Sequence, residues 1–110
     1  MKALIIKQPW IDHILNGEKD WEIRGSKTNI RGEIELIPSG SGLIAGKCCI
    51  VECKQLSLQE YRQSKQYHCI EDVDVLPYKK TFAWVLTNPK RYSKPKPYKH
   101  PRGAIIWVNV

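Results

Sequence analysis

The sequence predicts an α+β domain in which about six short strands form a small curved sheet with two or three short flanking helices. Apolar residues occupy alternate positions over Gly32–Pro38, which is typical of a strand. Apolar residues from Trp10 to Leu15 recur at helical spacing, and Gly17 follows as a stop signal. Ser57 and Glu60 have the spacing of a capping box, which predicts a second helix. The 110 residues fit one domain, residues 1–110.

The N-terminal part should alternate between strand and helix. Lys2–Ile6 is expected to be the first strand, and Asp20–Arg24 the second. Pro9 fits the first turn of the helix between them, because its missing N–H leaves no hydrogen bond unmade there. Gly25–Asn29 is expected to be a polar turn.

Two further strands should make up the middle of the sheet. In Gly32–Pro38 the alternation places Glu33 and Glu35 outwards and the apolar residues inwards. The apolar run Leu43–Leu56 is too long for one flat strand, so we expect a bend or a bulge at Gly46.

The C-terminal part combines a helix, two strands and an arm. The helix should run from about Ser57 to Gln66, while residues 67–77 have no clear pattern. Thr81–Thr87 is expected to be a strand, and Gly103–Val110 to close the sheet. Ser93–Pro101 carries three prolines, which excludes an inner strand and predicts an extended surface arm.

The second strand brings charged residues onto one face. Because side chains alternate along a strand, Asp20, Glu22 and Arg24 share one face and Trp21 and Ile23 the other. Such a face is a candidate polar site on a rigid element backed by an apolar anchor. The alternative is a solvated face, where an exposed ion pair contributes only about 0–1 kcal/mol.

Lys19 lies at the mouth of this charged face and is the central candidate for chemistry. Partial burial and the guanidinium of Arg24 would favour a neutral amine, whereas Glu22 would favour the ammonium. A neutral Lys19 can act as a general base, and a charged one can hold a phosphate or a carbonyl. The sequence leaves both open.

The net charge of +7 is concentrated in the last third of the chain. Residues 1–75 hold 10 Lys and Arg against 11 Asp and Glu, while residues 76–110 hold 8 Lys and Arg and no acidic residue. Tyr92, Tyr98 and His100 are interleaved with these cations. Cations for phosphates and rings for bases are the expected footprint of a nucleic-acid contact. A solubilising basic loop is the alternative.

The order of several motifs resembles the ASCH domain (activating signal cointegrator homology), a branch of the PUA-like superfamily. These motifs are Gln8-Pro9-Trp10, a short helix, Gly-x-Lys-x-x-Glu-x-Arg over residues 17–24, and Arg31-Gly32 before a strand. The resemblance is strongest over residues 4–56. It implies a small PUA-like β-barrel and a cleft between barrel and helices that takes single-stranded RNA or a nucleotide.

On this basis we expect two groups of nucleic-acid-binding residues. Gln8 would bond a base edge, and Trp10 would anchor the first helix in the core. The glycine-rich loop after the third strand can approach a ligand closely. The residues expected to bind are Gln8, Lys19, Glu22, Arg24, Ser39 and Ser41 in the cleft, and Lys94, Lys96, Lys99 and Arg102 along the basic arm.

The resemblance also implies two kinds of enzyme. One is an acetylcytidine amidohydrolase, whose threonine nucleophile is replaced here by Glu22, so that only a general-base role for Glu22 remains. The other is a ribonuclease acting on single-stranded RNA, with Lys19, Ser39, Ser41 and Arg102 stabilising the transition state. In either enzyme Lys19 and Glu22 would be catalytic. A module that binds another protein is a third hypothesis for the same fold.

The remaining composition favours a cytoplasmic protein without a metal or other cofactor. Cys48, Cys49, Cys53 and Cys69 lack a C-x-x-C pair and are expected to be reduced thiols. No apolar run approaches the ~20 residues of a membrane span, and Met1–Lys7 reads as strand rather than signal peptide.

Overall fold

A computed structural model describes all residues, 1–110, and contains six strands and three short helices. The elements are β1 (Lys2–Ile6), α1 (Trp10–Leu15), β2 (Trp21–Arg24), β3 (Gly32–Pro38), β4 (Leu43–Leu56), α2 (Leu58–Gln63), α3 (Lys65–His68), β5 (Thr81–Pro97) and β6 (Trp107–Asn109). The α+β class and the six strands are therefore as predicted.

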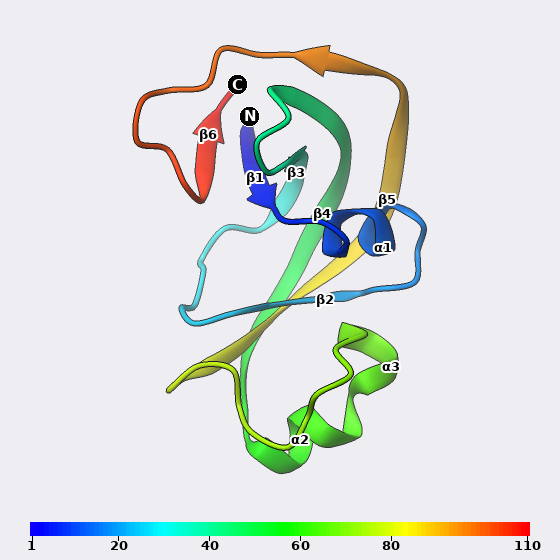
Figure 1. Ribbon diagram of the computed structural model, residues 1–110, viewed down its shortest axis with the longest axis vertical. Coiled ribbons are helices and arrows are strands. Elements are labelled where there is room, and N and C mark those ends of the chain that lie inside the picture. Colours follow the sequence, from blue (N-terminus) through cyan, green and yellow to red (C-terminus); the bar gives the residue numbers. More distant parts are fainter.

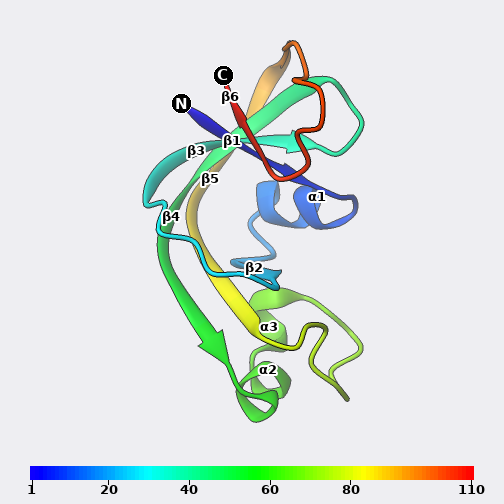
Figure 2. The ribbon, with the colours of Figure 1, turned by 90° about the vertical axis from the view of Figure 1, so that its left-hand side faces the viewer.

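The strands form one sheet in the order β2-β5-β4-β3-β1-β6, in which only β1 and β3 are parallel neighbours. Figure 1 shows β4 and β5 running along most of the molecule. In Figure 2 these strands curve, and α1, β2, α2 and α3 all lie on the concave side. The sheet is not closed, because β2 and β6 are its two edges, so the expected barrel is not observed.

Three irregularities in the pairing of β4 with β5 account for the curvature of these strands. The β4–β5 pairing shifts register between Ile44 and Gly46, then twice more along the pair, as the predicted bulge requires. A Cβ on Gly46 would collide with the carbonyl oxygen of Lys90 and with the Leu15 side chain. Glycine therefore lets α1 and β5 approach this point of the sheet.

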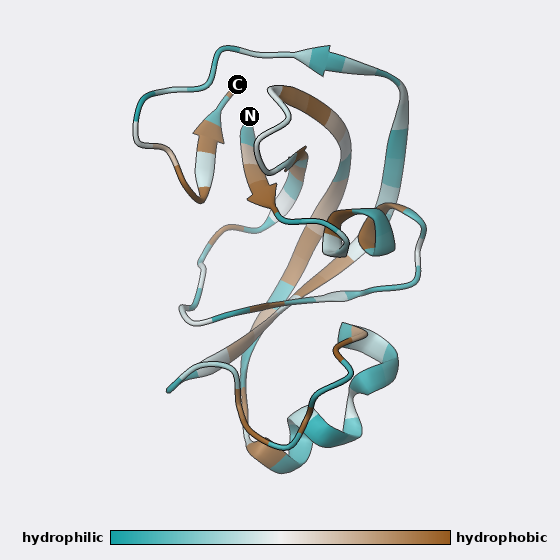
Figure 3. Cartoon of the chain, in the orientation of Figure 1, coloured by the Kyte–Doolittle hydropathy of each residue, from teal (hydrophilic) through white to brown (hydrophobic).

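The core has one layer on each face of the sheet. Leu4, Ile34 and Trp84 pack under α1, whereas Ile5 and Ile37 pack on the opposite face. Figure 3 shows the apolar segments gathered in the strands, with the C-terminal half of β5 largely hydrophilic. No helix in the chain has the length and apolar character needed to cross a membrane.

The alternation with Glu33 predicted that Glu35 faces solvent, but it does not. Its side chain is buried, and its carboxylate accepts a hydrogen bond from the Tyr92 hydroxyl at 2.5 Å and an ion pair from Lys96 at 2.9 Å. Burial opposes ionisation of Glu35, but these two partners outweigh it and lower the pKa of the carboxyl.

The prolines of Ser93–Pro101 predicted a free surface arm, but the first part of this segment belongs to the sheet. Residues 93–97 continue β5 and pair with β4, where Leu43 lies opposite Pro97 and Ile44 opposite Lys96. The prolines are tolerated because β2 pairs with β5 only over Phe82–Val85, which leaves the other edge of this end of β5 free.

Three other boundaries differ from the sequence-based expectation. The capping box at Ser57 is present, but the helix is interrupted at Ser64, whose hydroxyl donates to the Glu60 carbonyl at 2.6 Å. This side chain competes with the helical ladder and divides the segment into α2 and α3. β6 is limited to Trp107–Asn109, and Asp20 precedes β2 as an exposed residue.

Candidate functional site

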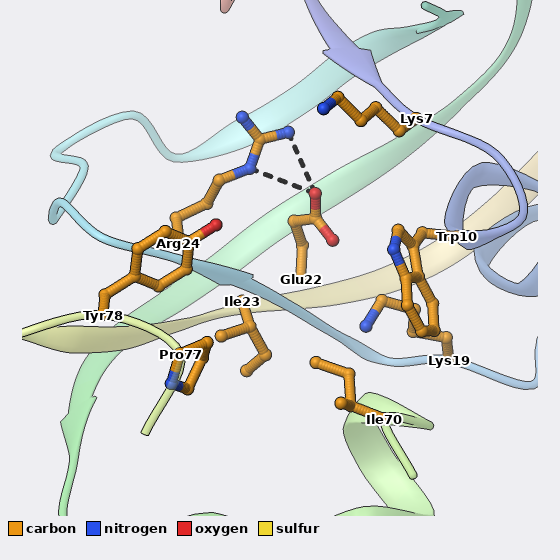
Figure 4. A pocket seen from close by; sticks show the side chains of 9 residues that line it. All are labelled: Lys7, Trp10, Lys19, Glu22, Ile23, Arg24, Ile70, Pro77 and Tyr78. Carbon is orange, nitrogen blue, oxygen red and sulfur yellow. Dashed lines mark hydrogen bonds and ion pairs between the residues drawn. The ribbon is translucent and has the colours of Figure 1, made fainter. Parts of the chain in front are cut away.

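A cavity of about 240 Å³ lies between β2, the N-terminus of α1 and the segment that leads into β5. Figure 4 shows the Trp10 indole on one side of it and the Tyr78 ring on the other, with Glu22 between them. The cavity is lined by Lys7, Trp10, Lys19, Glu22, Ile23, Arg24, Ile70, Pro77 and Tyr78. It thus combines two rings, three cations and one carboxylate.

The Lys19 side chain is almost completely buried, with 2% of its surface exposed. Its ammonium donates a hydrogen bond to the His68 carbonyl and lies 4.9 Å from the centre of the Trp10 ring. Of its three N–H donors, only this one has a protein acceptor. Burial lowers the pKa of Lys19, and the carboxylate of Glu22 opposes that shift.

Glu22 and Arg24 form a largely buried ion pair on one face of β2, as the alternation predicted. Oε2 of Glu22 accepts a hydrogen bond from Nε of Arg24 at 3.0 Å and forms an ion pair with Nη2 at 2.9 Å. Nη2 also donates to the Ile5 carbonyl at 2.9 Å, which fixes the guanidinium. Oε1 of Glu22 and Nη1 of Arg24 make no hydrogen bond within the chain and remain available to a ligand (Figure 4).

His68 supports the Lys19 side of the cavity from behind. Its ring is completely buried and stacks on Tyr61 with the centroids 4.5 Å apart. The Ile70 N–H donates to Nδ1 at 3.0 Å, so Nε2 carries the proton and donates to the Tyr61 carbonyl at 2.7 Å. Burial lowers the pKa of His68 and keeps the imidazole neutral.

The Tyr78 wall depends on a glycine. A Cβ at Gly25 would lie 2.9 Å from Cδ1 of Tyr78, so the ring packs directly on the glycine backbone. Tyr78 itself is largely exposed, with 46% of its surface accessible. An exposed ring that walls a polar cavity is available for stacking with a ligand.

The family model described as "ASCH domain" matches residues 4–96, which is most of the chain. The chain belongs to the ASCH domain family. That family is associated with RNA binding. No curated protein matches the sequence.

Solved structures agree with this assignment. The ASCH protein of Zymomonas mobilis superposes with a TM-score of 0.76 over 99% of this chain and 86% of that chain, at 10% identity. A single-residue variant of it gives a TM-score of 0.76 at 10% identity over 99% and 87% of the two chains. Another variant gives 0.71 at 12% identity over 86% and 73%. At this identity the likeness shows the fold alone.

The ASCH fold brings together only part of the predicted site. Lys19, Glu22 and Arg24 line one cavity, as expected. Gln8 is exposed and does not line it. Ser39 lines a different pocket, and the Ser41 hydroxyl is held in its own turn by the backbone of Leu43.

The predicted basic residues also separate. Lys94 and Lys96 line a shallow hollow on β5 together with Tyr92. Arg91, which neighbours Tyr92 on β5, bonds Asp12 of α1. Because side chains alternate along a strand, Tyr92 and the hollow therefore lie on the sheet face away from α1. Lys99 and Arg102 are exposed beyond the end of β5. Lys96 is held by Glu35 and is therefore partly structural.

Sequence reasoning missed several lining residues. Trp10, expected in the core, is only half-buried and covers Lys19. Lys7 and Tyr78 were not singled out. The signals that could have marked them are their neighbours: Gln8-Pro9 follows Lys7, and Pro77 and Lys79 flank Tyr78. The uncertain segment 67–77 supplies Ile70 and Pro77 to the floor. Trp84 is buried in the core, and Trp107 is half-buried and stacks on it.

Proposed function

We propose that this ASCH domain binds single-stranded RNA and takes one unstacked base into the cavity between Trp10 and Tyr78. The observation that supports this is the set of unused polar atoms there. Lys19 and Arg24 offer N–H donors without protein acceptors, and Oε1 of Glu22 offers an acceptor. A nucleobase edge carries both donors and acceptors, so it can match such a set.

Single-stranded RNA suits the cavity better than a duplex does. An unpaired base can leave its stack, enter a pocket and be hydrogen-bonded on its edge while its faces contact aromatic side chains. The exposed Tyr78 ring and the half-buried Trp10 indole supply such contacts. Stacking on an aromatic side chain contributes about 1–3 kcal/mol per base.

The phosphates would meet the cations outside the cavity. The Lys7 side chain at its rim has no ion pair or hydrogen bond within the chain, and the exposed Lys94 and Lys99 would contact phosphates farther along the strand, outside the cavity. Neutralising phosphates releases counterions, which makes binding salt-dependent. The family association with RNA binding agrees with this arrangement.

The test is binding of fluorescently labelled oligouridylate, oligocytidylate and oligoadenylate to the wild type and to Lys19→Met and Glu22→Gln. Methionine keeps the length and apolar stem of Lys19, and glutamine keeps the shape of Glu22. We expect each change to weaken binding about tenfold, as loss of a charge-assisted hydrogen bond does.

Glu33→Gln and Lys2→Met are the matched controls, because both residues are exposed and neither lines the cavity. Circular dichroism of each variant separates lost binding from lost structure. Folded Lys19 and Glu22 variants that bind as tightly as the wild type would refute the proposed base pocket. Absence of RNA binding by the wild type would favour a protein-binding module.

One observation favours a second candidate, a small hydrolase acting on a modified nucleoside or RNA. Burial lowers the pKa of Lys19, which moves it towards the range of a general base. Glu22 would orient the attacking water through Oε1. Incubation with acetylcytidine, followed by chromatography for cytidine, tests this role. Product from the wild type and none from Lys19→Met is the supporting result, and no product from either removes it.

A further inference from the structure

A second pocket, of about 500 Å³, adjoins the base cavity. It is lined by Ile5, Lys7, Ser39, Gly40, Gly42, Tyr98, His100, Ala104 and Ile105. Lys7 lines both pockets. The two hollows are therefore neighbours that share one lysine as part of their common wall.

The Lys7 side chain is free to serve a ligand at this boundary. It is exposed, follows the end of β1, and makes no ion pair or hydrogen bond within the chain. In Figure 4 its ammonium lies at the edge of the first cavity, on the same side as the Arg24 guanidinium. Arg24 is itself bonded to the carbonyl of Ile5, a residue that lines the second pocket.

The Ser39–Gly42 turn adds neutral donors to the second pocket. The Ser39 hydroxyl and the backbone N–H groups of Gly40 and Gly42 have no acceptor within the chain. Both glycines have positive φ, at +80° and +70°, while the Ser41 N–H between them donates to the Pro38 carbonyl at 3.0 Å, so Gly40 and Gly42 each contribute one separate free N–H. A lysine beside such donors is a favourable environment for a phosphate.

Tyr98 supplies an aromatic wall whose hydroxyl is held in place. His100 donates from Nε2 to the Ala104 carbonyl at 2.8 Å, and its Nδ1 lies within hydrogen-bonding distance of the Tyr98 hydroxyl, at 2.7 Å. The Tyr98 ring also packs against the core layer that contains Ile5 and Ile37. This rigid ring can contact a ribose or a base.

We propose that the second pocket holds the neighbouring nucleotide of the strand, so that the ligand of this domain spans at least two nucleotides. The phosphodiester between them would lie at Lys7 and the Ser39–Gly42 turn, and the second nucleoside against Tyr98. This inference rests on the proposed RNA binding at the base cavity and adds the length, polarity and second subsite of the ligand.

Uridine and the dinucleoside monophosphate UpU are the probes, because they differ by one nucleoside and one phosphate. Calorimetric titration of the wild type should show that UpU binds at least about tenfold more tightly than uridine, the effect of one added charge-assisted contact. Lys7→Met and Ser39→Glu should reduce this ratio to below about threefold, by removing the cation and by repelling the phosphate respectively.

Lys2→Met is the matched control, since Lys2 begins β1 and Lys7 follows its end, about 17 Å away along an extended strand. It should leave the ratio unchanged. A UpU-to-uridine ratio near one in the wild type, or an unchanged ratio in both Lys7→Met and Ser39→Glu, would overturn the second subsite while Lys19-dependent uridine binding persists. Loss of that Lys19 dependence would instead refute the proposed base pocket.

Discussion

The ammonium of Lys19 lies 4.9 Å from the centre of the Trp10 ring, so the indole of α1 covers the charge that precedes β2. A cation over an indole face is attracted by the ring's negative quadrupole. This contact joins the two parts of the family motif, Gln8-Pro9-Trp10 and the Gly17–Arg24 segment, in one wall. The motif residues are therefore coupled in space as well as in sequence.

Lys19→Met should raise the stability of the fold at neutral pH by about 1 kcal/mol, because a buried charge is replaced by an apolar side chain of similar length. Urea unfolding of both proteins at pH 7 measures this difference. A variant less stable than the wild type would show that the hydrogen bond to the His68 carbonyl outweighs the cost of burial.

The advantage of Lys19→Met should shrink as the pH rises. The pKa of Lys19 is lower in the folded chain than its ordinary value of 10.5, so the unfolded chain binds more protons between the two values. Stability of the wild type therefore rises with pH in that window relative to the variant. Unfolding at pH 7 and pH 10 checks the sign, and a gap that widens at pH 10 would contradict it.

Glu22→Gln should destabilise the fold by about 2 kcal/mol, because it leaves the guanidinium of Arg24 without its charged partner in a largely buried position. Glu33→Gln is the control. Glu33 pairs with Lys47 at 3.2 Å on the surface, and its loss should cost under about 0.5 kcal/mol. Equal losses in the two variants would indicate that the Glu22–Arg24 pair is no stronger than a surface pair.

Gly25→Ala should weaken RNA binding several-fold with little effect on the core. The new Cβ would displace the Tyr78 ring, which walls the cavity beside Glu22 but is itself exposed. Ser26→Ala changes the next exposed residue and should bind RNA as the wild type does. Binding unchanged by Gly25→Ala would mean that Tyr78 does not contact the ligand.

The double variant Lys94→Gln and Lys99→Gln should weaken binding to all RNA sequences alike. If each lysine neutralises one phosphate, the slope of log affinity against log salt should fall by about 1.4, at ~0.7 per phosphate of a single strand. Lys96 is left intact because it pairs with the buried Glu35. An unchanged slope would exclude these two lysines from the RNA path.

Sequence reasoning predicted those features that a few neighbouring residues determine. The capping box at Ser57 and the bulge at Gly46 are local, and both are present. The shared face of Glu22 and Arg24 follows from the two-residue period of a strand.

Errors arose where a distant segment provides the partner. Glu35 is buried because strand pairing brings Tyr92 and Lys96 beside it, and no pattern within β3 records that. The sequence likewise could not separate Ser39 from the cavity that Lys19 and Glu22 line, since that depends on how the turn lies against β1 and Tyr98.

The sequence by itself determined the family, the α+β class and the charged face of β2, because motif order and side-chain period are properties of the chain. Only the tertiary structure decided that Trp10 and Tyr78 face each other across that charge, and that Lys7 joins a second pocket to the first. The physical reason is that the relative positions of side chains from separate elements are set by sheet register and packing between segments far apart in the chain.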